Sequence, residues 1–239
     1  MDNRTYPRDK HAISIIACTN RRSCMENLFR NYSRQNFRDT ELIVILNHKS
    51  LKLDEYLQAA RPYQNVRIYS LPEHVSLGSC LNYGVSLSRY GLIAKFDDDD
   101  YYGPNYLTES RRVLLTTGAD IVGKRAHFMY LSGRKVLLLR YGNRADRYAP
   151  LVQGATLLIR RHVFSQVGFP DRNRGECVKL CSDSLAKGFT IYSGSPYNFL
   201  AIRRKNAKSH TWTANEDDLL RRHPRVGKVK NIRRFVCRG

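Results

Sequence analysis

The stretch Leu92-Ile93-Ala94-Lys95-Phe96-Asp97-Asp98-Asp99-Asp100 decides the fold, because a short, largely apolar segment ends in four consecutive aspartates. Such a run is typical of a buried strand. Four adjacent carboxylates repel one another unless a cation or hydrogen-bond donors neutralise them. Ligands of an open α/β sheet bind beyond the carboxyl ends of its strands. We therefore expect a divalent metal at residues 97–100; the alternative is an acidic loop with solvated charges.

Upstream of this stretch, apolar runs alternate with helical patterns. This order predicts an α/β fold with a Rossmann-like, mostly parallel central sheet flanked by helices. A capping box, Ser23-x-x-Glu26, predicts the start of a helix that runs to about Asn36. The expected strands are Ala12–Cys18, Glu41–Leu46, Val66–Tyr69 and Leu92–Phe96, and the other expected helices are Leu53–Ala60, Leu77–Arg89 and Asn105–Thr117.

The second half of the chain has a mixed pattern. Ser132-Gly133 predicts a hairpin, and Gly188 is a suitable residue to follow a helix. The expected strands are Ala126–Tyr130, Lys135–Arg140, Gly154–Ile159, Thr190–Tyr192 and Asn198–Arg203, and the expected helices are Arg161–Gln166 and Cys177–Lys187. We expect one domain over residues 1–215, with a nucleotide-binding half (11–117), a substrate half (118–215) and a basic tail (216–239).

The chain is strongly basic. Its 239 residues include 41 Lys and Arg against 21 Asp and Glu, a net charge of +20. Such a charge favours anionic partners, which include nucleotides, charged polymers, nucleic acid or an anionic membrane surface. The aromatic residues are not interleaved with basic ones as in a nucleic-acid module, so we expect no specific nucleic acid. The basic tail is expected to contact an anionic acceptor, scaffold or membrane surface.

The remaining composition favours a cytoplasmic protein. Mean hydropathy is −0.50, and no apolar stretch approaches the roughly 20 residues that cross a bilayer. The first residues carry no apolar segment of the signal-peptide kind. None of the six cysteines has zinc-like C-x-x-C spacing, so we expect reduced thiols, most of them in the core.

Four segments together resemble glycosyltransferase family 2. In chain order they are AISIIACTNRR, ELIVILN, LGSCLNYGVSLSRYGLIAKFDDDDYYGPNYL and GFPDRNRGECVKLCSDSLAKGF. The resemblance covers about residues 13–212 and implies the GT-A fold, a nucleotide-diphosphate sugar donor (a UDP-sugar is favoured), Mn²⁺ or Mg²⁺, and inverting transfer to a saccharide or polymer acceptor. The end of the chain also resembles transferases of bacterial spore-coat polysaccharide, which implies a role in cell-surface or spore-coat synthesis.

The resemblance places the family's D-x-D metal-binding segment on FDDDDYYGPNYL. It implies that Asp99 is the direct metal ligand and that Asp97 contacts the sugar or ribose. His210, in SHTW, is a second expected metal ligand; the alternative is an ordinary loop histidine. A metal at this place would neutralise the charge that grows on the departing diphosphate without a proton transfer.

The resemblance also implies residues that bind the donor. Asn47 stands where the family commonly has an aspartate, which leaves the nucleotide base open. Arg21 is expected to contact the donor; the alternative interpretation is a solvated arginine at the start of a helix. For Asn82, the alternative interpretation is an ordinary polar residue of a helix. The expected substrate-binding residues are Thr19, Arg21, Asn47, Gly78, Asn82, Asp97 and Arg203. Arg203 ends the last expected strand and is expected to reach the diphosphate or an acidic acceptor; the alternative is a solvated arginine.

Inverting transfer needs a carboxylate that removes the proton of the acceptor hydroxyl. The family supplies it from an acidic pair after a glycine, and here the pair is Glu176-Cys177. Glu176 is the expected base, Asp183 the second candidate and Asp171 a third. Because a cysteine stands in the pair, a catalytically degenerate protein that binds nucleotide or polysaccharide is the alternative function.

Overall fold

The computed structural model describes residues 11–204 and 215–238. Its centre is a sheet of eight strands in the order β3-β2-β1-β4-β10-β6-β11-β9. The first four strands pair in parallel, whereas β10 is antiparallel to both of its neighbours. The strands are β1 (Ile13–Thr19), β2 (Thr40–Leu46), β3 (Val66–Ser70), β4 (Leu92–Asp97), β6 (Ile121–Gly123), β9 (Arg147–Tyr148), β10 (Leu158–Arg160) and β11 (Ile191–Ser193).

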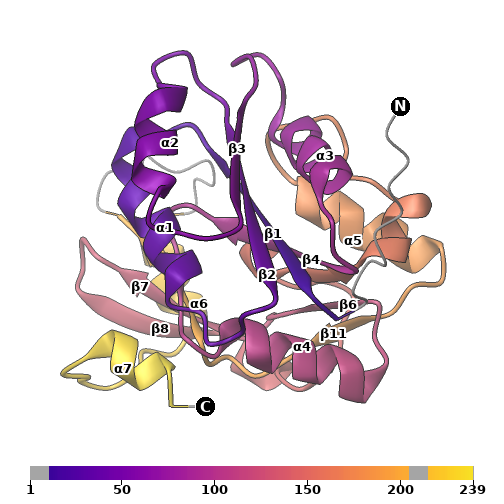
Figure 1. Cartoon of the computed structure of the whole chain (residues 1–239). Helices are drawn as coiled ribbons and strands as arrows, with labels where there is room; N and C mark the ends of the chain where they lie inside the picture. Colours follow the sequence, from indigo (N-terminus) through magenta and orange to yellow (C-terminus); the bar gives the residue numbers. More distant parts are fainter. Residues whose placement is uncertain (1–10, 205–214, 239) are drawn as a thin grey trace.

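Helices cover both faces of this sheet, as Figure 1 shows. Successive residues of a strand point to opposite faces, and β1 follows this rule. Ile15 packs in the core cluster shared with α1 and α2, and Ile16 packs in the one shared with α3 and α5. The helices are α1 (Met25–Ser33), α2 (Leu53–Ala60), α3 (Leu77–Leu87), α4 (Tyr106–Thr117) and α5 (Glu176–Ala186). The α/β prediction is confirmed, because strands buried on both faces need apolar residues at nearly every position.

A second, four-stranded sheet has the order β5-β12-β7-β8. Its antiparallel pair β7 and β8 is the predicted hairpin. The strands are β5 (Tyr101–Tyr102), β7 (His127–Leu131), β8 (Val136–Arg140) and β12 (Phe199–Arg203). The short strand β5 follows the acidic run directly and pairs with β12, so this run joins the two sheets.

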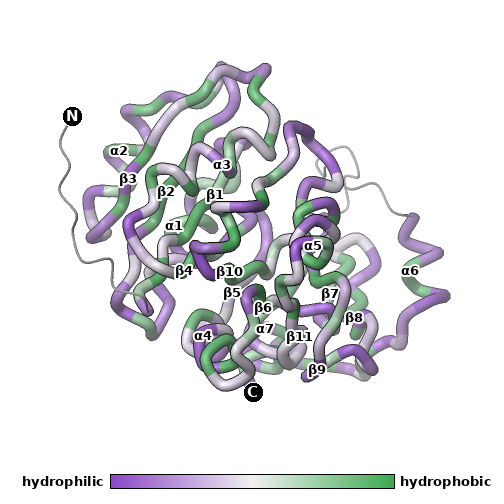
Figure 2. The backbone as a smooth tube through the Cα atoms, turned by 90° about the vertical axis from the view of Figure 1, so that its right-hand side faces the viewer, coloured by the Kyte–Doolittle hydropathy of each residue, from purple (hydrophilic) through white to green (hydrophobic). Residues whose placement is uncertain are grey.

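Residues 216–238, which lie in the segment described above as a basic tail, contain α6 (Glu216–Arg222) and α7 (Ile232–Val236). Leu219 belongs to the main core, and Val236 is fully buried against the second sheet. The backbone N–H of Asn198 donates to the carbonyl of Val236 at 2.7 Å. Figure 2 shows the hydrophilic character of α6, which otherwise carries mostly charged residues. The segment therefore combines basic charge with apolar anchors.

Three local predictions differ from the structure. The capping box is wrong: Ser23 lies in a 3₁₀ turn, and α1 starts at Met25 with no side-chain cap. Cys24, which precedes α1, has helical dihedral angles, whereas a capping side chain needs an extended backbone. Residues Gly154–Thr156 form a 3₁₀ turn ahead of β10 rather than part of a strand, and Arg161–Ser165 form a 3₁₀ rather than an α-helix. Within the described residues, no helix has the length and apolar character needed to span a membrane.

Candidate functional site

Asp98, the second aspartate of the run, is buried and links the end of β4 to the end of β1. It is 4% exposed. Its Oδ2 accepts a hydrogen bond from the hydroxyl of Thr19 at 2.6 Å, and its Oδ1 pairs with the guanidinium of Arg21. Burial raises the pKa of Asp98 although Arg21 acts in the opposite direction. Thr19 and Arg21, both expected at the nucleotide, thus hold the loop after β1 against the acidic run.

The fourth aspartate, Asp100, faces the second sheet. Its Oδ1 accepts the backbone N–H of Ile202 in β12 at 2.9 Å. Its carbonyl oxygen accepts the side-chain amides of Asn27 and Asn31, each at 2.8 Å. Burial raises the pKa of Asp100 well above its ordinary value, and the nearby charges of Asp99 and Asp97 raise it further. Asp100 therefore fixes the position of the run.

Asp97 and Asp99 alternate with these two inward residues. Asp97 ends β4, and its side chain is 37% exposed and contacts the ammonium group of Lys95. Asp99 is 14% exposed, and its Oδ2 lies 3.0 Å from Nη1 of Arg21. Both carboxylates act on the pKa of Asp100, so all three lie within electrostatic reach of one another. At this edge of the sheet, the carboxylates of Asp97 and Asp99 therefore remain partly accessible to solvent.

The two outward carboxylates fit a divalent metal that shares its coordination with a ligand. In the described ranges 11–204 and 215–238, no group of three or more His, Cys, Asp or Glu side chains is arranged to hold a metal. Mg²⁺ is usually held by one or two carboxylates together with phosphates and water. Asp97 and Asp99 supply this number of hard oxygen ligands. His210, the other expected ligand, lies outside the described residues.

Lys95 connects the acidic run with the start of α5. It is 6% exposed. Burial lowers its pKa, but the charges of Asp97 and Glu176 outweigh that effect, so the net pKa of Lys95 is raised. The ammonium group therefore contacts the carboxylate of Asp97 and lies within electrostatic reach of Glu176, the predicted base. Sequence reasoning missed Lys95, although a single lysine inside the apolar stretch Leu92–Phe96 is the signal that points to it.

Glu176 is the first residue of α5 and is 8% exposed. The thiol of Cys177 donates to its Oε1 at 3.2 Å. Burial raises the pKa of Cys177 well above its ordinary value, so the thiol keeps its proton and can act as this donor. Cys177, which stands where the family has a second acidic residue, thus donates a hydrogen bond to the carboxylate of Glu176 and does not act as a second carboxylate.

The other two base candidates lie in different surroundings. Asp183 is two turns further along α5 and pairs with Lys179 on the exposed side of that helix. Asp171 accepts hydrogen bonds from the hydroxyls of Ser76 and Ser79 at the start of α3, which lower its pKa. Of the three candidates, Glu176 is the one whose charge acts on the buried Lys95, which itself contacts Asp97.

The predicted donor residues of α3 fasten this helix to the loop before α5. The side-chain amide of Asn82 donates to the carbonyl of Phe169 at 2.8 Å, and its oxygen accepts the N–H of Phe169 at 3.0 Å. A Cβ atom on Gly78 would lie 1.8 Å from the carbonyl oxygen of Pro170. Only a glycine permits this approach, so Gly78 and Asn82 set the position of the loop that leads to Glu176.

The remaining two predicted donor residues lie at the ends of other strands. The side-chain amide of Asn47, just after β2, donates to the carbonyl of Pro72 at 2.8 Å. Arg203 ends β12 with a buried side chain, and its carbonyl accepts the N–H of Ser132 at 2.9 Å. The neighbouring guanidinium of Arg204 reaches the sulfur of Cys24 at 3.4 Å, close to the loop that carries Arg21.

Comparison with known proteins agrees with this arrangement. Residues 14–165, more than half of the chain, match the sequence model described as glycosyl transferase family 2. A curated relative, the O-antigen biosynthesis glycosyltransferase WbnJ of Escherichia coli, is 31% identical over 111 residues. The alignment covers 46% of this chain and 43% of that protein.

Solved structures share the fold at low identity. S. aureus TarS 1-349 in complex with UDP-GlcNAc has a TM-score of 0.66 and 15% identity, over 87% of this chain and 63% of that one. The mannosyltransferase PcManGT from Pyrobaculum calidifontis, in complex with GDP-Man and Mn²⁺, has a TM-score of 0.61 and 14% identity, over 83% and 57%. The chain thus spans less than two thirds of each of these proteins. Its fold is GT-A, and the chain belongs to glycosyl transferase family 2.

Proposed function

We propose that this protein is an inverting glycosyltransferase that moves a sugar from a nucleotide-diphosphate sugar to an acceptor hydroxyl. The observation that carries the proposal is the buried Lys95, which contacts Asp97 in the acidic run and lies within electrostatic reach of Glu176, a buried carboxylate at the start of α5. Structural neighbours in complex with UDP-GlcNAc, UDP and GDP-Man support a donor of this class. A UDP-sugar remains our favoured donor.

The donor would sit at the ends of β1 and β4. Asp99 would hold Mn²⁺ or Mg²⁺, Asp97 would contact the sugar or ribose, and His210 remains a proposed second ligand. When bound, the ion neutralises charge on the departing diphosphate. Arg21 already lies at Asp99 and holds the loop in place. The further proposed donor contacts are Thr19, Asn47, Gly78, Asn82 and Arg203.

Glu176 would act as the base on the acceptor side. Its carboxylate takes the proton of the acceptor hydroxyl while the hydroxyl oxygen attacks the anomeric carbon, and the bond to the diphosphate breaks on the opposite side. Lys95 would keep both Glu176 and Asp97 in place through the charge at its buried ammonium group. We further propose that the acceptor belongs to a cell-surface polysaccharide and that the protein works in the cytoplasm. The O-antigen transferase among its relatives supports the first point.

The test measures release of nucleoside diphosphate from a panel of nucleotide sugars in the presence of Mn²⁺. We expect Asp99→Ala to abolish release, and we expect Glu176→Gln to lower transfer by about 10²- to 10⁴-fold while donor binding is kept. Two variants serve as controls that retain activity: Asp54→Ala, at the exposed start of α2, and Asp183→Asn, further along α5.

Parental turnover by Asp99→Ala would show that the metal assignment is wrong. Tight nucleotide binding by the wild-type protein with no release from any donor would favour the alternative, a GT-A protein that binds nucleotide or polysaccharide without catalysis.

A further inference from the structure

A cluster of cationic and imidazole side chains lies in the second half of the fold, where β8 ends and α6 ends. Arg140, the last residue of β8, is 7% exposed. Its Nε donates to Nε2 of His223 at 3.3 Å, and its Nη1 lies 3.5 Å from Nε2 of His127. Both imidazoles are buried. A guanidinium is thus held between two histidines below the surface of the protein.

Both histidines are neutral in this arrangement. Nδ1 of His127 lies 3.0 Å from the carbonyl oxygen of Arg125, so this nitrogen carries the proton and Nε2 can accept from Arg140. Burial and the charge of Arg140 lower the pKa of His127 to about 3. The same causes lower the pKa of His223. The two rings therefore position Arg140 without neutralising its charge.

Tyr141 is fixed against this cluster in a strained conformation. Its backbone has φ 49° and ψ 42°, which is uncommon for a bulky residue and is a feature that gathers at functional sites. The guanidinium of Arg125 lies 4.0 Å from the centre of its ring, and the ring of His223 packs edge-on at 4.8 Å. Its hydroxyl accepts a hydrogen bond from Nη2 of Arg140 at 3.5 Å. The phenolic proton therefore remains available to a further acceptor.

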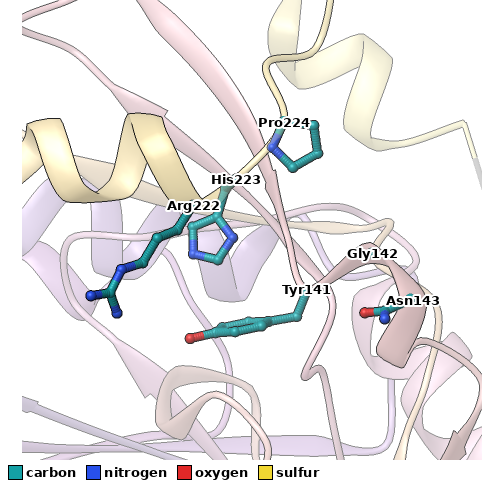
Figure 3. A pocket seen from close by; sticks show the side chains of 6 residues that line it. All are labelled: Tyr141, Gly142, Asn143, Arg222, His223 and Pro224. Atoms are coloured by element: carbon teal, nitrogen blue, oxygen red, sulfur yellow. The ribbon is translucent and has the colours of Figure 1, made fainter.

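A cavity of about 430 Å³ opens beside this tyrosine. Figure 3 shows the ring of His223 above Tyr141, with the hydroxyl of Tyr141 and the guanidinium of Arg222 extending to the same side. Within residues 11–204 and 215–238, Arg222 has no carboxylate at ion-pair distance. The lining residues are Tyr141, Gly142, Asn143, Arg222, His223 and Pro224.

We propose that this cavity binds an oxyanion, a phosphate or a carboxylate, carried by the acceptor saccharide. Arg125 stacks on the ring of Tyr141, Arg140 donates to its hydroxyl, and Arg222 lines the cavity beside it, so three positive charges gather at this tyrosine. An anion in the cavity would offset the repulsion among these like charges. A guanidinium matches the two oxygens of either group through parallel hydrogen bonds. The volume lies in the range of small-molecule sites. The acceptor role rests on the proposed function, whereas the binding of an oxyanion does not.

The test is a titration of the full chain with inorganic phosphate, followed by two-dimensional NMR at an ionic strength kept constant with chloride. We expect saturable binding to the wild-type protein and a dissociation constant about tenfold higher for Arg222→Gln, the loss expected when one charged hydrogen-bond donor is removed. Arg221→Gln is the matched control. It removes the same charge one position away, from a residue paired with Asp218, and should bind phosphate as the wild type does. Equal binding by Arg222→Gln and the wild type, or no saturable binding by the wild type, would overturn the site.

A second arm identifies the group and separates this site from the proposed function. Glucose 6-phosphate should compete with phosphate if the site recognises a phosphate group, and glucuronate should compete if the site recognises a carboxylate. Glucose, which carries neither group, should not compete. Competition by glucose equal to that of both charged sugars would overturn an oxyanion site. A wild-type protein that turns over no donor would refute the proposed function and leave the phosphate result standing.

Discussion

At the scale of single residues, the acidic run shows how identical side chains acquire different environments. Asp98 and Asp100 point inward and are held by hydrogen bonds, whereas Asp97 and Asp99 reach the edge of the sheet. The resemblance pointed to the acidic run and to Glu176 as parts of one site. It could not show that the buried Lys95 contacts Asp97 and lies within electrostatic reach of Glu176, because Glu176 comes about 80 residues further along the chain.

Lys95 should be worth far more to stability than a surface lysine. In Lys95→Met, Asp97 loses its buried cationic partner, and breaking a buried ion pair costs about 3–5 kcal/mol. Because Asp97 is partly exposed, we expect the lower end, about 3 kcal/mol, in the free energy of unfolding measured with urea. Lys179→Met is the control, because its pair with Asp183 is exposed and such pairs contribute about 1 kcal/mol or less. Equal losses in the two variants would refute a bridging role for Lys95.

At the scale of elements, periodicity located the helices and strands of the first hundred residues to within a few residues, but it missed the buried strand β6 and did not locate the contacts between elements. Leu53–Ala60 is a helix with the predicted limits, and Leu77–Leu87 is shorter than predicted by two residues. The attachment of α3 to the loop before α5 depends on backbone carbonyls, which have no signal in the sequence. The short strand β5 was likewise missed, because two tyrosines form no periodic pattern.

Gly78→Ala tests the contact between α3 and this loop. Alanine normally stabilises a helix relative to glycine by about 0.5–1 kcal/mol. Here the added Cβ would meet the carbonyl oxygen of Pro170, so we expect destabilisation by about 1–3 kcal/mol in thermal or urea unfolding. Gly227→Ala is the matched control, because nothing lies within 4 Å of its Cβ position. A Gly78→Ala protein as stable as this control would show that the loop can move away at no cost.

At the scale of the whole molecule, composition predicted the charge of the C-terminal segment but not its packing. Val236 is fully buried on the second sheet, with partly buried Ile232 and Phe235 in the same cluster. Apolar residues spaced among arginines and lysines gave no regular pattern, so the segment was interpreted as a tail. Its described part covers one face of the second sheet, and removing it would expose that face as well as remove charge.

The stability of the whole molecule should fall in acid because of His127. The pKa of His127 is lowered to about 3 in the folded protein by burial and by Arg140, against about 6.5 when unfolded. The unfolded chain therefore binds one more proton between these values. The contribution of the neutral His127 to the free energy of unfolding is fully present above about pH 6.5. It is lost as pH falls toward 3, at about 1.4 kcal/mol per pH unit.

His127→Gln removes this proton while keeping a side chain that can accept from Arg140. We expect the difference in unfolding free energy between the wild type and this variant, measured with urea at pH 7, 6, 5 and 4, to shrink as pH falls. Asp98 and Asp100, whose pKa values are raised, act in the opposite direction but are present in both proteins and cancel in the difference. Parallel curves across this range would show that His127 is not buried in its neutral form.

The pairing of β5 with β12 has a consequence for insertions and deletions near the acidic run. Residues 98–100 form the turn that joins β4 to β5, so losing one aspartate would shorten this turn and pull Tyr102 out of its place beside β12. The phenol of Tyr102 now accepts the N–H of Asp97 at 2.7 Å and donates to the carbonyl of Ala155 at 2.6 Å. A shortened run would still be acidic, yet this tyrosine would no longer reach both partners. The spacing of this segment therefore tolerates less variation than its chemistry does.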